Sequence, residues 1–80
     1  MFINKAKDGL CNVCGKQIAV FRTAMHISQR ELADRLQVIG LDVDKNAIQR
    51  MEAGKRFVTD IELIALAKVL NKTVAELLSE

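Results

Sequence analysis

Three short patterns mark where helices begin in this chain of 80 residues, and they limit its fold more than any other feature. In each, a Ser or Thr is followed three residues later by Glu: Ser28 and Glu31, Thr59 and Glu62, Thr73 and Glu76. The hydroxyl of such a pair accepts a backbone N–H of the first helical turn, while the Glu carboxylate accepts the N–H of the capping residue. Because both N–H groups would otherwise be unpaired, the sequence predicts a helix after each pattern.

Apolar residues at helical spacing place these three helices within a set of five. We expect the set to cover about 12–25, 28–39, 45–53, 60–70 and 74–78. Asp44 is a favourable cap for the third helix. Gly40 suits a left-handed end to the second, with Leu41 folding back on it, and Gly54 ends the third. Because no segment has the alternation of a strand, the sequence predicts an all-α, compact five-helix domain.

The apolar positions that recur on one face of each helix should form the core. They are Cys14, Ile18, Phe21 and Met25 in the first helix, Leu32, Ala33 and Leu36 in the second, Ala47, Ile48 and Met51 in the third, and Leu63, Leu66, Ala67 and Leu70 in the fourth. Residues 1–11 lack this periodicity. We therefore expect an N-terminal arm, 1–11, ahead of a single domain, 12–80.

Composition narrows the class of protein. Half of the residues are apolar, 4% are aromatic, and there is no Pro or Trp, which is typical of a compact helical protein. No apolar run approaches the ~18 residues of a membrane span, and the N-terminus lacks the layout of a signal peptide. We expect a cytoplasmic protein without membrane contact. Because no nucleophile–base–acid set and no glycine-rich phosphate loop is visible, we expect no enzyme activity, no cofactor and no small-molecule ligand.

Charge is small overall but unevenly placed along the chain. The net charge is +2. Residues 45–56 hold four cations and one anion, which gives +3, whereas residues 28–44 sum to −2. If the third helix and the segment after it share a surface, that surface is suited to nucleic acid.

The third helix carries side chains with the chemistry of base recognition. Lys45, Asn46, Gln49 and Arg50 fall on its outward side. In the major groove, Asn and Gln can pair with adenine through two hydrogen bonds, and Arg can pair with guanine in the same way. The first turn of the second helix and the basic exit of the third suit backbone phosphates instead. The positions concerned are Gln29, Lys55 and Arg56.

Two stretches of the chain point to a known family. They are SQRELA at 28–33 and IQRMEAGKR at 48–56. Together they resemble the lambda-repressor-like (Cro-type, XRE family) helix-turn-helix domains, and the resemblance extends from about Cys14 to Leu78. It implies a lambda-repressor-like fold in which the second and third helices form the helix-turn-helix and bind the major groove of double-stranded DNA.

The resemblance also implies roles for individual residues. It assigns a phosphate contact to Gln29 and base contacts to Lys45, Asn46 and Arg50, with Gln49 beside them. It further implies a structural ion pair between an arginine of the first helix, Arg22, and the glutamate that ends the third, Glu52. Such a pair adds little net stability, but removing one partner is costly.

One segment departs from the family pattern. The turn between the second and third helices is usually only a few residues long, and here residues 37–42 (QVIGLD) add about five. Val38, Ile39 and Leu41 are apolar, so we expect this insert to pack against the domain. The lengthened turn leaves the fold unchanged and bears on the angle at which the third helix enters the groove.

Several residues outside this pattern invite other interpretations. Cys11 and Cys14 form a CxxC motif, but a zinc site needs four ligands and only His26 remains to join them. A redox pair lacks its usual fold context. We interpret the cysteines as reduced thiols at a helix start, one of them buried, and His26 as a loop residue. Lys5 and Lys7 are interpreted as solvated rather than as an arm along DNA.

These observations indicate a sequence-specific DNA-binding transcriptional regulator, and we expect a repressor. One alternative is the DNA-binding antitoxin or control protein of a two-gene system. Another is a helical protein-interaction module without DNA binding, against which the polar and basic face of the third helix argues. One domain presents one recognition helix, which covers only a few base pairs, so we expect a homodimer on a near-palindromic operator. Candidates for the dimer surface are Val38, Ile39, Leu41, Val74, Leu77 and Leu78.

Overall fold

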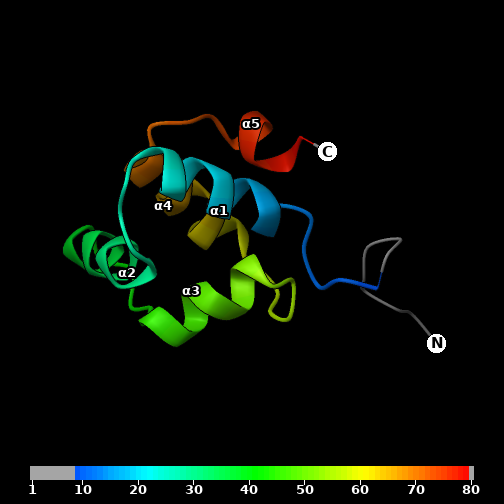
Figure 1. Ribbon diagram of the computed structural model, residues 1–80, viewed down its shortest axis with the longest axis horizontal. Coiled ribbons are helices and arrows are strands. Elements are labelled where there is room, and N and C mark those ends of the chain that lie inside the picture. The colour runs from blue at the N-terminus through cyan, green and yellow to red at the C-terminus, as the bar shows by residue number, and fades with distance from the viewer. Residues whose placement is uncertain (1–8, 80) are drawn as a thin grey trace.

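Five helices make up the part of the chain that the computed structural model describes, residues 9–79 (Figure 1). They are α1 (Gly15–Ala24), α2 (Gln29–Val38), α3 (Lys45–Glu52), α4 (Asp60–Leu70) and α5 (Val74–Leu78). The prediction of an all-α, five-helix fold is confirmed, with no strand between residues 9 and 79. Lys5 and Lys7 of the expected arm lie outside the described residues.

The predicted helix starts are formed by local hydrogen bonds. At each of the three Ser/Thr–Glu patterns, the hydroxyl accepts the N–H of the Glu and the Glu side chain accepts the N–H of the cap. Asp44 caps α3 by accepting the N–H of Ala47 at 2.8 Å. The exception is α1, which begins at Gly15 rather than near residue 12 or 13. Its first turn is capped by Asn12, whose Oδ1 accepts the N–H of Gly15 at 2.8 Å.

Four helices end in left-handed residues, namely His26 after α1, Gly40 after α2, Gly54 after α3 and Asn71 after α4. Each turn is closed by a backbone hydrogen bond from the following residue to a carbonyl of the last helical turn. After α2, the N–H of Leu41 donates to the carbonyl of Leu36 at 3.0 Å, so Leu41 folds back on the helix as predicted. The chain therefore turns sharply on both sides of α3.

Part of the insert, residues 37–42, forms the turn between α2 and α3. Gln37 Nε2 donates to the carbonyl of Val43 at 2.7 Å, and Val43 is buried beneath the turn. Leu41 is half-buried against the core, as expected. Val38, at 86% exposed, and Ile39, at 49%, face outward instead. They belong to the last turn and cap of α2, so their direction is set by the helix.

The core lies where α1, α4 and α5 meet the pair formed by α2 and α3. α2 packs against α3 and α4, and α1 packs against α3, α4 and α5. Fully buried side chains come from all five helices: Ile18, Leu32, Leu36, Ile48, Met51, Leu66, Leu70 and Leu77. In Figure 1, α3 lies at the lower edge of the molecule and α5 at the opposite edge, so one side of α3 is left uncovered. Within residues 9–79, no helix has the length and apolar character needed to cross a membrane.

Candidate nucleic-acid interface

The uncovered side of α3 carries the four residues that the sequence assigns to base contacts. Lys45, Asn46, Gln49 and Arg50 are exposed, and none of them makes a side-chain hydrogen bond or ion pair within residues 9–79. The opposite side of the helix is anchored by Ala47, Ile48 and Met51, which are buried. The helix is therefore held by one face while the other presents amide, ammonium and guanidinium groups together.

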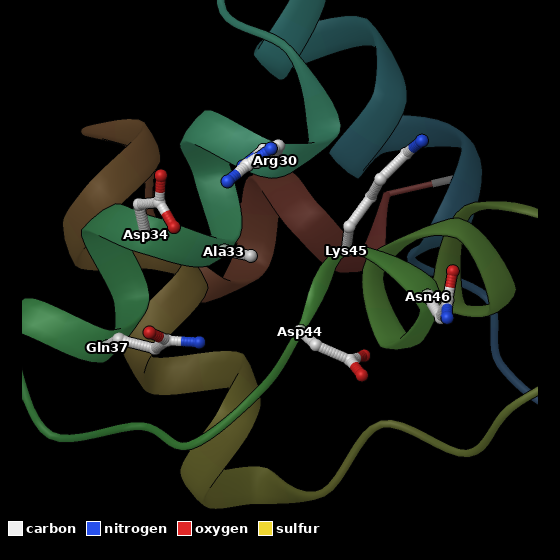
Figure 2. Close-up of a pocket in the computed structure, with 7 residues that line it drawn as sticks. All are labelled: Arg30, Ala33, Asp34, Gln37, Asp44, Lys45 and Asn46. Atoms are coloured by element: carbon white, nitrogen blue, oxygen red, sulfur yellow. The ribbon is translucent and has the colours of Figure 1, made fainter.

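A shallow recess separates the start of α3 from α2 (Figure 2). Figure 2 shows Lys45 and Asn46 on the first turn of α3 and Arg30 on α2, on the other side of the recess. Asp34 and Asp44 line the same recess, so its wall has both signs of charge. Arg30 is exposed and was not among the predicted site residues. Its position directly after Gln29, in the first turn of α2, was the signal that could have identified it.

Gln29 lies at the junction between this face and the interior. It is half-buried in the first turn of α2, and its Nε2 donates to Glu52 Oε1 at 3.0 Å. One side-chain donor of Gln29 is thus used inside the protein. The side-chain oxygen and the second amide N–H are left for other partners, and a phosphate contact by Gln29 stays a prediction.

Glu52 is the centre of a network that ties α3 to the rest of the domain. Arg22 donates to its carboxylate from Nε at 2.7 Å and from Nη2 at 3.1 Å, and Gln29 completes the set. Arg22 also donates from Nη1 to the carbonyl of Ile27 at 2.9 Å. The hydrogen bonds with Glu52 raise the pKa of Arg22 above its usual value. Arg22 and Glu52 thus form the ion pair that the family resemblance implies, and their side chains are only 14% and 9% exposed.

The two cations that follow α3 have different surroundings. Lys55 is exposed and its side chain makes no hydrogen bond or ion pair within the described residues. Arg56 instead donates to both carboxylate oxygens of Glu62, at 2.9 Å each, and to the carbonyl of Phe57. These bonds lower the pKa of the buried Glu62, so the pair stabilises the fold at neutral pH and this contribution is lost as the pH falls through that lowered pKa. Lys55 is the freer candidate for a phosphate, and the phosphate contact of Arg56 stays a prediction.

The segment before α1 lies against the end of α3, a contact that the sequence pattern did not reveal. Asn12 Nδ2 donates to the carbonyl of Met51 at 3.0 Å and to that of Arg56 at 2.7 Å. The N–H of Cys11 donates to the carbonyl of Gly54 at 2.8 Å. The sequence predicts Asn12 only as the approximate start of the first helix. An Asn just ahead of a helix is a common cap. Nothing nearby in the sequence indicates that its amide also donates to the carbonyls of Met51 and Arg56.

The remaining candidate residues show no sign of separate chemistry. Cys14 is buried, and burial raises the pKa of its thiol, which disfavours the reactive thiolate. Cys11 is half-buried, and both cysteines are free thiols. His26 is exposed in the turn between α1 and α2, as predicted, with a positive φ of 59°. In the part of the chain that the structure describes, no three potential metal ligands gather.

Comparison of the sequence and the structure with known proteins agrees with the helix-turn-helix arrangement described above. The sequence matches the helix-turn-helix family over residues 18–77. The restriction-modification controller protein C.AhdI from Aeromonas hydrophila is 28% identical, with a TM-score of 0.70 over 80% of this chain and 86% of that chain. The clp gene regulator ClgR from C. glutamicum is 24% identical, with a TM-score of 0.72 over 84% of this chain and 80% of that chain, and shares the fold. No curated protein sequence matches the chain.

Proposed function

Because the chain belongs to the XRE-type helix-turn-helix family and is a DNA-binding transcriptional regulator, we propose that it is a repressor that reads its operator with α3. The observation that supports this most directly is the division of α3 into two faces. Three apolar residues anchor it, and four unpaired polar and basic residues face outward. We call α3 the recognition helix from here on. A helix held by its apolar face can enter a major groove without losing core contacts.

A second candidate differs in biological role rather than in chemistry. The similar structure C.AhdI is described as a restriction-modification controller protein. The same recognition helix would serve in a controller of a two-gene system, and the two roles differ in the protein's partner rather than in the chemistry of the site. A helical module without DNA binding is disfavoured, because the exposed face of α3 carries the amide and cationic groups that recognise base edges.

Readout by the recognition helix is testable with single substitutions. The preferred site is first selected from random DNA. Asn46→Ala or Arg50→Ala should then weaken binding to that site by about 1–3 kcal/mol and weaken binding to random DNA much less, because base contacts contribute only on the correct sequence. Arg35→Ala, which removes an exposed cation from α2 instead, is the matched control. Equal losses on both DNAs would reduce Asn46 and Arg50 to phosphate contacts.

The structure narrows the candidates for a dimer surface. Leu77 is fully buried, and Leu41 and Val74 are half-buried against the core, so these three belong mainly to the fold. Val38, Ile39 and Leu78 remain exposed, and of these Ile39 lines a shallow groove with Ile61 and Ile64 of α4. These isoleucines are 49%, 70% and 51% exposed. We propose that a second copy of the chain covers this apolar patch, which we define as Ile39, Ile61 and Ile64.

The charges around the apolar patch suit a second copy. Asp60 and Lys68 are exposed and lie at opposite ends of α4, with Ile64 midway between them in sequence. In a two-fold interface both subunits use the same surface. A contact between one residue of the first subunit and a different residue of the second therefore occurs two times, once in each direction. Two antiparallel copies of α4 that cross at Ile64 would therefore place each Asp60 beside the partner's Lys68.

A charge exchange tests this arrangement. Asp60→Lys and Lys68→Asp should each weaken self-association in sedimentation experiments, because like charges would then meet at both ends. Mixing the two variants should restore dimers, since the opposite charges again face each other. Lys16→Glu, which reverses an exposed charge on α1, is the control. Footprinting on the operator provides the opposite outcome. One protein bound to one half-site at saturating concentration, for the unsubstituted protein, for each variant and for their mixture, would exclude the dimer.

A further inference from the structure

We propose that the segment ahead of α1 is a positioning element for DNA binding, which sets the end of the recognition helix and the loop that carries Lys55. The segment, residues 10–12, is called the strap. The proposal rests on the proposed function, because it concerns how α3 and its exit loop meet DNA. It adds a role for residues that precede the family match, which begins at residue 18.

The Asn12 side chain is fully used at this place. An Asn amide offers two N–H donors and an oxygen acceptor. Both donor bonds go to carbonyls at and after the end of α3, those of Met51 and Arg56, and the oxygen accepts the N–H of Gly15. A single side chain therefore caps the start of α1 and holds the end of α3. The two segments that it joins are 39 and 44 residues away along the chain.

The backbone and apolar part of the strap hold the turn after α3. The N–H of Cys11 donates to the carbonyl of Gly54, and the Leu10 side chain lies over Gly54. Gly54 is buried, with a positive φ of 74°. A methyl group at this position would lie 2.8 Å from Leu10 Cδ2, so Leu10 occupies the space that a side chain would need. The turn that leads to Lys55 is thus held at Gly54 by a backbone hydrogen bond and by the packing of Leu10.

The strap also changes the electrostatics of this end of the helix. The last carbonyls of a helix lack partners within it and have a partial negative charge, which repels phosphate. Of the three strap donors, one binds the carbonyl of Met51 in α3, which also accepts the N–H of Gly54, and two bind the loop carbonyls of Gly54 and Arg56. The two loop carbonyls belong to the residues on either side of Lys55, so these donors offset partial negative charge directly beside the exposed cation of the loop. α3 has only 8 residues, so its own hydrogen bonds contribute little to fixing its end.

Asn12→Asp separates the two roles of the side chain. The carboxylate keeps the acceptor for the N–H of Gly15 but removes both donors to α3 and the loop. We expect DNA affinity to fall about tenfold on every sequence, and the slope of log affinity against log salt to become smaller by about one, as for a lost phosphate contact. Lys55→Ala alone should give the same change in slope. Asn12→Asp in the Lys55→Ala background should change the slope no further.

Asn12→Ser provides the second variant, because it keeps a helix-capping oxygen, adds no charge and is too short to reach the Arg56 carbonyl. Binding is measured at a temperature at which circular dichroism shows both variants folded. Asn12→Ser should also lower the salt slope. Normal affinity and slope in both folded variants would overturn the proposal and leave the strap a stabilising contact only. Failure of the unsubstituted protein to bind any DNA would instead overturn the proposed function itself.

Discussion

Replacing Glu52 with Ala should lower the free energy of unfolding by about 3–5 kcal/mol, the loss expected when one partner of a buried ion pair is removed. Three donor groups converge on this carboxylate, two from Arg22 and one from Gln29. Without it, the largely buried guanidinium of Arg22 keeps a single partner, the carbonyl of Ile27. Equilibrium unfolding in urea, with the midpoint and slope both fitted, measures the change.

A double-mutant cycle isolates the interaction between Arg22 and Glu52. Each single substitution to Ala should be costly, and the double substitution should cost much less than their sum. Lys72→Ala provides the surface comparison, because Lys72 approaches Glu76 at 4.0 Å in an exposed pair and lies 4.9 Å from the centroid of the Phe21 ring, contacts that should together contribute much less than the buried pair. Strictly additive losses of Arg22 and Glu52 would show that the two side chains do not depend on each other.

Gly15→Ala should destabilise the fold by about 3 kcal/mol, at the upper end of the usual cost of overpacking. The backbone at Gly15 is ordinary helix, so the cost does not come from its conformation. An added methyl group would overlap the carbonyl oxygen of Met51 and lie 2.9 Å from Asn12 Oδ1. The first is a backbone atom at the end of α3 and cannot rotate away. Thermal and urea unfolding measure the loss.

Gly40→Ala provides the comparison for Gly15→Ala. A methyl group at Gly40 would contact nothing within 4 Å, but the residue has a φ of 95°. Its substitution should therefore cost only the left-handed backbone penalty of about 1–2 kcal/mol. A smaller loss for Gly15→Ala than for Gly40→Ala would contradict the close packing of α1 on α3.

The parts of the fold that follow from neighbouring residues could be predicted from the sequence. The three capping boxes involve residues three apart, and each lies where it was predicted. The left-handed turn at Gly40 is equally local. The start of α1 could not be predicted in the same way. Asn12 and Cys11 are hydrogen-bonded to residues at and just after the end of α3, about 40 positions later in the sequence. Helix α1 begins beyond these two residues, at Gly15.

The candidate site shows the same limit. Periodicity was enough to place Lys45, Asn46, Gln49 and Arg50 on the exposed face of α3. It could not distinguish Lys55 from Arg56, because the two are adjacent and carry the same charge. Only the three-dimensional structure shows that Glu62 both caps α4 and binds Arg56. The sequence assigned Glu62 to the first task alone.

The long sequence separation of the strap has a consequence for the order of folding. Contacts between residues close in the chain form with little loss of entropy, whereas joining residues 12 and 51 closes a loop of about 40 residues. The capped helices can therefore form early, while the bonds of Asn12 to Met51 and Arg56 form only after α1 and α3 have docked. The end of the recognition helix is thus completed last, and we expect it to take its final geometry only when the strap has closed over it.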